Sequence, residues 1–154
     1  PMASPEVRAL FERDCAAAGA RIQVLDGQAR LALQAADAAL VASGTASLEA
    51  LLCRCPMVVA YRMNALTTFL LLALRIVRLR HFSLPNLLAG EALVPEFLQQ
   101  AVTGAALAAA LREQLSVGER RAALLNRFRD IHLRLRLDGA ARAADAVLEL
   151  IGTT

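Results

Sequence analysis

Residues 38–61, AALVASGTASLEALLCRCPMVVAY, contain two short apolar runs separated by a loop and a helix. The first run, residues 39–42, has the length and composition of a buried parallel strand. Residues 43–45, Ser-Gly-Thr, interrupt it, and residues 47–53 then carry leucines at helical spacing. A Cys-Pro step ends that helix, because the residue before a proline disfavours the α region, and residues 57–61 form the second strand. The loop before the helix exposes backbone N–H groups at the positive end of the helix dipole, where an anion such as phosphate binds.

The rest of the chain continues this alternation of strands and helices. Further strands are predicted at residues 21–25 and 81–84. Alternating strands and helices predict an α/β fold, with a Rossmann-like parallel sheet, flanking helices and a helical tail. Helices are predicted at residues 5–18, 28–36, 66–77, 105–115, 119–137 and 140–151, with a short turn at 87–90 and another helix that follows residues 93–95 and runs through residue 100.

The composition is that of a single globular domain. The 154 residues are 57% hydrophobic and 20% charged, which provides enough apolar material for a core. The net charge of +3 is carried by arginine, because the sequence contains no lysine. An arginine-rich genome explains this excess, and so does weak attraction to an anionic membrane surface or to phosphate-bearing ligands. Both explanations remain open.

Cysteine spacing and hydropathy bear on the compartment. The three cysteines form no disulfide framework and no CxxC pair, which indicates thiols in a reducing cytosol. No signal peptide is visible. The longest strongly apolar run, residues 69–74, is far shorter than the roughly 20 residues that a membrane span needs. The sequence therefore predicts no integral membrane segment, while contact with a membrane surface stays possible.

Four sequence blocks occur in a fixed order: SGTASLEALL at 43–52, CPMVVAYRM at 55–63, SLPNLLAG at 83–90 and LVPEFLQ at 93–99. Together they resemble the carboxyl-terminal half of lipid-A-disaccharide synthase, a family of bacterial glycosyltransferases with the GT-B architecture. The resemblance covers nearly the whole chain. In that family a strand, a donor-binding loop and an amino-terminal domain come first, whereas this chain starts with a helix. We therefore expect 1–154 to be a truncated carboxyl-terminal nucleotide-sugar-binding domain.

The loop and helix of the first block contain four candidate donor-binding residues. Gly44 allows close approach of the backbone to a ligand, and the hydroxyls of Ser43 and Thr45 can donate to phosphate oxygens. Glu49 lies one turn after Thr45 on the same helix face, where a carboxylate can accept two hydrogen bonds from a ribose diol. An ordinary helix start has the same residue types. In the GT-B enzymes that this chain resembles, a glutamate on the corresponding helix holds the ribose.

Two further groups are expected at strand ends, on the ligand edge of the sheet. Tyr61 can cover a uracil ring and Arg62 can face a diphosphate, although a packed tyrosine and a solvated arginine explain the pair as well. Ser83, Pro85 and Asn86 are expected at the end of the strand at 81–84. There Asn86 offers a donor and acceptors to a sugar or phosphate, and a turn asparagine is the alternative.

Other polar residues are given no catalytic or metal role. Glu91 stands where the family commonly has arginine, which argues against a phosphate role at this position. His81 and His132 have no acid at recognisable spacing, so neither is interpreted as a catalytic base. No cluster has the spacing of metal ligands, and no cofactor or nucleic-acid partner is expected.

The resemblance implies an inverting hexosyl transfer in lipid A biosynthesis. The donor would be UDP-2,3-diacylglucosamine, the acceptor 2,3-diacylglucosamine 1-phosphate, and this part would bind the UDP moiety. The acceptor and the general base would belong to the amino-terminal domain. The protein would be cytoplasmic and peripheral on the inner face of the inner membrane of a Gram-negative bacterium, with a homodimer left open.

Two alternatives belong to other classes of protein. The chain can be a non-catalytic helical module that self-associates or docks on a membrane through residues 66–74. It can also be another nucleotide-sugar enzyme of the same architecture, such as an epimerase. Binding of UDP favours an enzyme, whereas concentration-dependent association without nucleotide binding favours the module.

Overall fold

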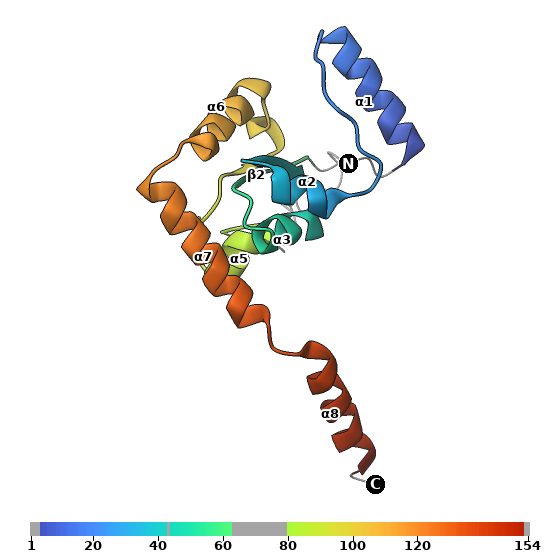
Figure 1. Ribbon diagram of the computed structural model, residues 1–154, viewed down its shortest axis with the longest axis vertical. Helices are drawn as coiled ribbons and strands as arrows, with labels where there is room; N and C mark the ends of the chain where they lie inside the picture. The colour runs from blue at the N-terminus through green and yellow to red at the C-terminus, as the bar shows by residue number, and fades with distance from the viewer. Residues whose placement is uncertain (1–3, 43, 63–79, 153–154) are drawn as a thin grey trace, which may run out of the picture.

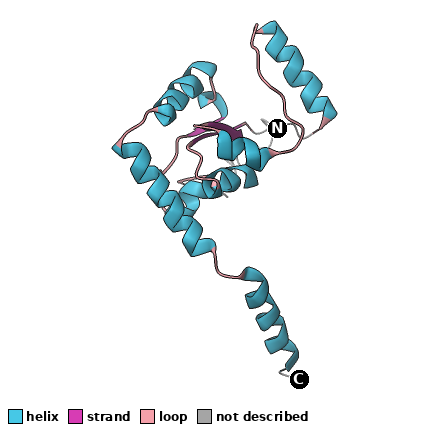
Figure 2. Cartoon of the chain, in the orientation of Figure 1, coloured by secondary structure: helices cyan, strands magenta, loops and turns pink. Residues whose placement is uncertain are grey.

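The computed structural model describes residues 4–42, 44–62 and 80–152 of the chain. Its centre is a three-stranded parallel sheet of β1 (Ala39–Ala42), β2 (Met57–Tyr61) and β3 (Glu96–Leu98), in the order β1-β2-β3. Figure 2 shows the strands surrounded by helices. The predicted α/β fold with a parallel sheet is confirmed, and β1 and β2 have the bounds that the sequence predicts.

The helices begin where the sequence offers a cap. The Ser4 hydroxyl accepts the N–H of Val7 at 3.3 Å, and the Thr103 hydroxyl accepts the N–H of Ala106 at 3.2 Å. The helices of the described residues are α1 (Pro5–Ala17), α2 (Ala29–Ala35), α3 (Thr45–Leu52), α5 (Leu84–Ala89), α6 (Gly104–Leu115), α7 (Glu119–Leu135) and α8 (Gly139–Gly152), with a 3-10 turn, η1 (Gln99–Ala101).

The two faces of β2 are covered by different helices. Met57 and Val59 are buried in one cluster with Leu51 of α3 and with Phe128 and Ile131 of α7. Each such side chain contributes roughly 1.5–3 kcal/mol when fully buried. Side chains alternate along a strand, so the residues between them face the other side, where α6 packs on β1 and β2. The core thus fixes β2 between two helical layers.

The helices at the two ends of the chain lie apart from this core. In Figure 1, α1 is joined to α2 by a long irregular segment, and α8 extends away from the body of the molecule. No residue of α1 is buried, and Val7 and Leu10, which the sequence placed on its apolar stripe, are 49% and 50% exposed. In α8 the side chains of Val147, Leu148 and Ile151 are likewise exposed.

The predicted strand at residues 21–25 is wrong. Residues 20–25 belong to no helix or strand, and Asp26 makes only an isolated bridge. The sequence has the β-branched and apolar residues of a strand, but a strand also requires a neighbour. In the sheet of the described residues, β1 is an edge strand, and residues 21–25 are not paired to it.

The order of elements after residue 80 is also corrected. Residues 81–84 do not form a strand: Ser83 is the N-cap of α5, Pro85 occupies its first turn, and Gly90 ends it with φ 73°. The strand lies later, at Glu96–Leu98, where a helix through residue 100 was predicted. Pairing with β2 decides this, because the Val59 N–H donates to the Pro95 carbonyl at 2.9 Å and β3 then follows in register. The predicted helix at 66–77 lies outside the described residues.

Candidate functional site at the carboxyl edge of the sheet

The carboxyl ends of the three strands meet at one edge. The register places Ala42 beside Ala60, and Tyr61 beside Leu98. The residues that follow these strands are therefore neighbours, including Gly44 after β1 and Arg62 after β2. In doubly wound sheets this edge is where ligands bind.

The start of α3 has the geometry that the first block predicted. Gly44 is the N-cap, with φ 124° and ψ −157°, a backbone conformation that essentially only glycine adopts. No atom lies within 4 Å of a Cβ built on it, so glycine is required here by conformation and not by crowding. The Ser47 hydroxyl donates to the Gly44 carbonyl at 2.7 Å and holds the loop. Ser43 lies outside the described residues.

Thr45 and Glu49 are both exposed on α3, one helical turn apart. No side chain of the described residues caps this helix, so its first N–H groups are left for another acceptor. The structure thus places a hydroxyl, free N–H groups and a carboxylate on one exposed face beside the end of β2.

Tyr61 and Arg62 lie at the same edge. Tyr61 is 40% exposed, and by strand alternation it points to the α3 side, as Val59 does. The Nε of Arg62 donates to the carbonyl of Gln99 at 3.2 Å. This bond ties the guanidinium to the turn that follows β3.

Gln99 is a residue of this edge to which the sequence led us to assign no role. It follows β3 directly, and its φ of 54° is unusual for a residue other than glycine. The helix predicted through residue 100 concealed the strand end. The positive φ and the Arg62 contact are signals that only the fold provides.

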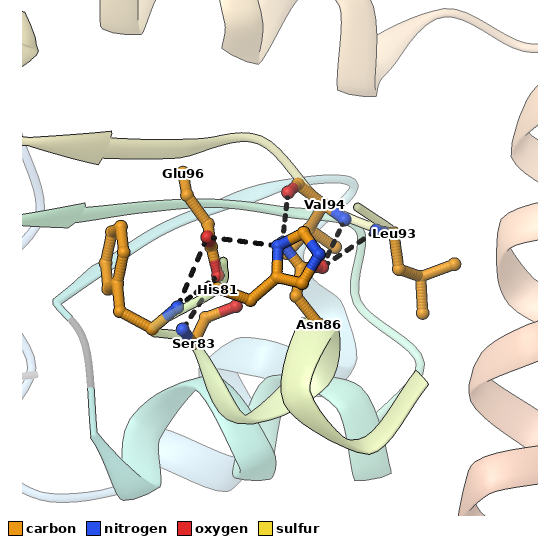
Figure 3. Close-up of polar contacts among 7 residues, drawn as sticks. His81, Ser83, Asn86, Leu93, Val94 and Glu96 are labelled. Atoms are coloured by element: carbon orange, nitrogen blue, oxygen red, sulfur yellow. Dashed lines mark hydrogen bonds and ion pairs between the residues drawn. The ribbon is translucent and has the colours of Figure 1, made fainter. Parts of the chain in front are cut away.

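Ser83 and Asn86 lie beneath this edge, in α5 instead of at a strand end. Asn86 is 1% exposed, and its amide is engaged inside the protein (Figure 3). Its Nδ2 donates to the Val94 carbonyl at 2.9 Å, and its Oδ1 accepts the N–H groups of Leu93 and Val94, both at 2.8 Å. Asn86 therefore joins α5 to the segment that leads into β3.

The Ser83 hydroxyl is the one buried side-chain oxygen or nitrogen without a hydrogen-bond partner among the described residues. Its backbone N–H, by contrast, donates to Glu96 at 2.7 Å. The hydroxyl of an N-cap residue ordinarily accepts an N–H of the first turn, and here it does not. The start of α5 is thus held by Glu96 and not by its own cap.

Glu96 also approaches a histidine that the sequence left without an acid. His81 Nδ1 lies 3.7 Å from Glu96 Oε2, and the two side chains are 20% and 11% exposed. The residues are fifteen positions apart, so no spacing in the sequence signals the pair. The statement that His81 has no acid partner is therefore corrected.

Glu91 lies at the other end of α5, where it forms an ion pair with Arg127 of α7 through both Nε and an outer guanidinium nitrogen. An open cleft of about 610 Å³ adjoins this pair and continues along the α6–α7 connection. This cleft lies beside the amino end of β3, away from the edge where the predicted residues gather. Its volume alone does not make it the site, because arginine–glutamate pairs occupy much of its lining, including Arg120 with Glu113.

The cysteines show no redox or metal arrangement. All three are free, and burial raises the pKa of the Cys55 thiol above its usual range. No group of three His, Cys, Asp or Glu side chains that could hold a metal is present in the part of the chain that the structure describes. Within the same residues, no helix is both long enough and apolar enough to cross a bilayer.

Comparison with known proteins decides the family. Residues 1–149 match the family model described as lipid-A-disaccharide synthetase. The chain belongs to the lipid-A-disaccharide synthase family. It is 52% identical over 153 residues to the lipid-A-disaccharide synthase of Sodalis glossinidius and 49% identical over 152 residues to that of Erwinia tasmaniensis. These matches cover 98% and 97% of this chain.

A third relative, the lipid-A-disaccharide synthase of Pseudomonas fluorescens strain Pf0-1, is 49% identical over all 154 residues. The chain spans only about 40% of the length of each of these relatives. The family is one of bacterial glycosyltransferases of lipid A biosynthesis, which confirms the resemblance inferred from the four sequence blocks.

Proposed function

We propose that this chain is the UDP-binding part of a lipid-A-disaccharide synthase. The whole protein would transfer 2,3-diacylglucosamine from its UDP donor to 2,3-diacylglucosamine 1-phosphate. The observation that carries this proposal is the gathering of Gly44, Thr45 and Glu49 beside Tyr61 and Arg62 at the carboxyl edge of the sheet. These groups provide what a nucleoside diphosphate requires: N–H donors, a cation, a carboxylate and an aromatic ring.

The diphosphate would lie at the start of α3. The uncapped N–H groups of the helix and the Thr45 hydroxyl would donate to phosphate oxygens, with Ser43 as a further hydroxyl. Arg62, tied to the Gln99 carbonyl, would hold a positive charge close by. When the sugar is transferred, negative charge develops on the departing UDP, and preorganised donors of this kind stabilise it.

The nucleoside would extend along the exposed face of α3. Glu49 is exposed one turn after Thr45, so its carboxylate would accept hydrogen bonds from the two ribose hydroxyls. Tyr61, at the end of β2, would lie against the uracil ring. The general base and the acceptor site would belong to segments of the whole protein beyond this chain.

The role proposed for Ser83 and Asn86 in donor binding is indirect. Both side chains are buried, and Asn86 is fully engaged with residues 93–94. We assign them to the support of the segment before α5 and of the segment before β3. A change at either position would then act on the donor through the geometry of the edge.

The lipid chemistry suggests where the whole protein works. Its acylated donor and acceptor are amphipathic, so a protein that is peripheral on the inner face of the inner membrane would meet both. A homodimer is compatible with this arrangement, and light scattering of the whole protein tests it.

Calorimetric titration of the chain with UDP, uridine and ADP tests the proposal. We expect saturable binding of UDP, weaker binding of uridine, which lacks the diphosphate, and weaker binding of ADP, which lacks uracil. Arg62→Gln should weaken UDP binding about tenfold or more, as expected for a charged hydrogen bond. Arg120→Gln, at an exposed arginine of α7, is the matched control and should change nothing. Absence of UDP binding, or equal losses in the two variants, would contradict the proposal.

An interaction module is the second candidate, and one observation favours it. Val147, Leu148, Leu150 and Ile151 of α8 are 53–77% exposed, although α8 has clear amphipathic character. An exposed apolar face of this kind promotes association. Concentration-dependent oligomers that bind no UDP would support this candidate over the donor-binding proposal.

A further inference from the structure

The pair of His81 and Glu96 is used by no step of the proposed function, yet it is well defined (Figure 3). His81 lies just before α5, and Glu96 is the first residue of β3. Their side chains approach to 3.7 Å, between Nδ1 of the imidazole and Oε2 of the carboxylate. Both are mostly buried, at 20% and 11% exposure.

The carboxylate of Glu96 is fixed by the backbone. Its Oε1 accepts the N–H of Ser83 at 2.7 Å and that of Phe82 at 3.3 Å, and Oε2 is 3.4 Å from the same Phe82 nitrogen. The N–H groups that precede α5 therefore already have an anion supplied by the chain itself. An external ligand would not need to satisfy them, and Glu96 is left to orient His81.

The register places this pair at the carboxyl edge. Glu96 lies opposite Val59, two residues before the terminal pair of Leu98 and Tyr61. Ser83 is bonded to Glu96, and Asn86, further along α5, is bonded to Leu93 and Val94. Helix α5 thus runs from the carboxyl side of the sheet toward the amino side. His81, two residues before Ser83, lies on the carboxyl side of that contact.

This placement puts His81 on the same face of the sheet as the start of α3. Glu96 is opposite Val59, which belongs to the core shared with α3, and α3 contacts α5. Both helices follow the same direction, so both begin at the carboxyl edge. A ligand bound along that edge would meet the start of α3 on one side and residues 80–82 on the other.

The chemistry of His81 suits a phosphate. With Nδ1 toward a carboxylate, the tautomer and the ring orientation are set, and the other nitrogen, Nε2, is directed to a different partner. Nε2 forms no hydrogen bond with any residue that the structure describes, and the side chain retains 20% exposure through which a ligand can reach it. A carboxylate, an imidazolium and a phosphate arranged in this order alternate in charge.

We propose that His81 is a further donor-binding residue, whose Nε2–H donates a hydrogen bond to a phosphate oxygen of the nucleoside diphosphate, while Glu96 positions the ring. The inference rests on the proposed function, because it places the diphosphate at this edge. It adds a group that stabilises the charge on the departing diphosphate from the α5 side. His81 contacts the ligand in this scheme, and Glu96 is a positioning residue.

Two substitutions of His81 separate a ligand contact from a structural one. His81→Asn keeps an N–H near the position of Nδ1, facing Glu96, and removes the Nε2 donor. His81→Gln has the reverse effect, because its longer side chain carries an N–H to about the position of Nε2. A role in holding the fold predicts that asparagine is the better replacement, and a role in ligand binding predicts that glutamine is.

The test is calorimetric titration of the wild-type chain and both variants with UDP and with uridine. We expect His81→Asn to bind UDP about 10- to 100-fold more weakly, the range for hydrogen bonds to charged groups, with uridine binding unchanged. His81→Gln should recover most of the UDP affinity. His132→Asn, at the exposed histidine of α7, is the matched control and should bind as wild type does.

Each result has a definite meaning. Equal UDP affinity of wild type and His81→Asn overturns the inference and leaves the proposed function standing. Equal losses for UDP and uridine also overturn it, because they indicate a structural role. If the wild-type chain binds no UDP, the proposed function fails, and the inference fails with it.

Discussion

Replacing Asn86 with alanine should destabilise the protein strongly, although Asn86 was identified from its sequence block as a ligand residue. The side chain is 1% exposed and makes three hydrogen bonds of 2.8–2.9 Å to the backbone of residues 93 and 94. At a net value of about 1 kcal/mol for each bond, their loss costs roughly 3 kcal/mol. Water that enters the space of the lost amide offsets part of the penalty of unpaired backbone groups, so we expect a loss of about 2–4 kcal/mol in the free energy of unfolding.

Urea denaturation followed by circular dichroism measures this quantity. Asn126→Ala is the matched control, because Asn126 is an exposed residue of α7 and its replacement should change stability by less than about 0.5 kcal/mol. Asn86→Asp is informative as a third variant. It keeps the acceptor for two N–H groups but turns the donor toward the Val94 carbonyl into a second acceptor, so it should recover only part of the loss.

A loss below about 0.5 kcal/mol for Asn86→Ala, equal to that of the exposed control, would refute the reasoning. It would mean that residues 93–94 do not depend on the amide and that β3 is positioned by other contacts. A large loss of UDP affinity in a variant of unchanged stability would point instead to direct contact between Asn86 and the donor.

Three further predictions follow from single residues. Gly44→Ala should cost about 1–3 kcal/mol of stability, because φ 124° is strained for any other residue, while Gly118→Ala, at an extended glycine, should cost little; equal unfolding midpoints in urea would contradict this. Glu49→Gln should weaken UDP binding by about 1.5–3 kcal/mol and 2′-deoxy-UDP binding by much less; losses that simply add would reduce Glu49 to a helix residue. Cys55, whose buried thiol has a raised pKa, should react with iodoacetamide only after unfolding, whereas mass spectrometry should find the partly exposed Cys15 and Cys53 alkylated in the native protein; modification of all three at similar rates would show that Cys55 is accessible.

Local sequence signals predicted most of the helices and two of the strands. The caps at Ser4 and Thr103 and the apolar runs at residues 39–42 and 57–61 act within a few residues, so the sequence contains their full cause. Strand β3 was missed because its three residues, Glu-Phe-Leu, have no strand pattern of their own. It exists because its backbone pairs with β2. The strand expected at residues 21–25 failed for the opposite reason, since its composition is suitable but it pairs with no strand of the described sheet.

The candidate site divides in the same way. Gly44, Thr45, Glu49, Tyr61 and Arg62 follow directly from strands that the sequence located correctly, so their placement at one edge could be predicted. The error in locating β3 carried over to the residues around it. Ser83 and Asn86 were placed at a strand end, whereas both belong to a helix and are buried. The contact of His81 with Glu96 depends on two segments that only tertiary pairing brings together.

The most direct test of the donor-binding proposal is to map UDP onto the chain by ¹H–¹⁵N NMR titration. The account predicts saturable shifts of the amide signals at the start of α3, from Gly44 to Glu49, and at Tyr61 and Arg62, with micromolar to millimolar affinity. Signals of the cleft between Glu91 and Arg127, near the amino end of β3, should not move. Shifts confined to that cleft, or no shifts at millimolar UDP in a folded protein, would contradict the claim that the carboxyl edge of this sheet binds the nucleotide.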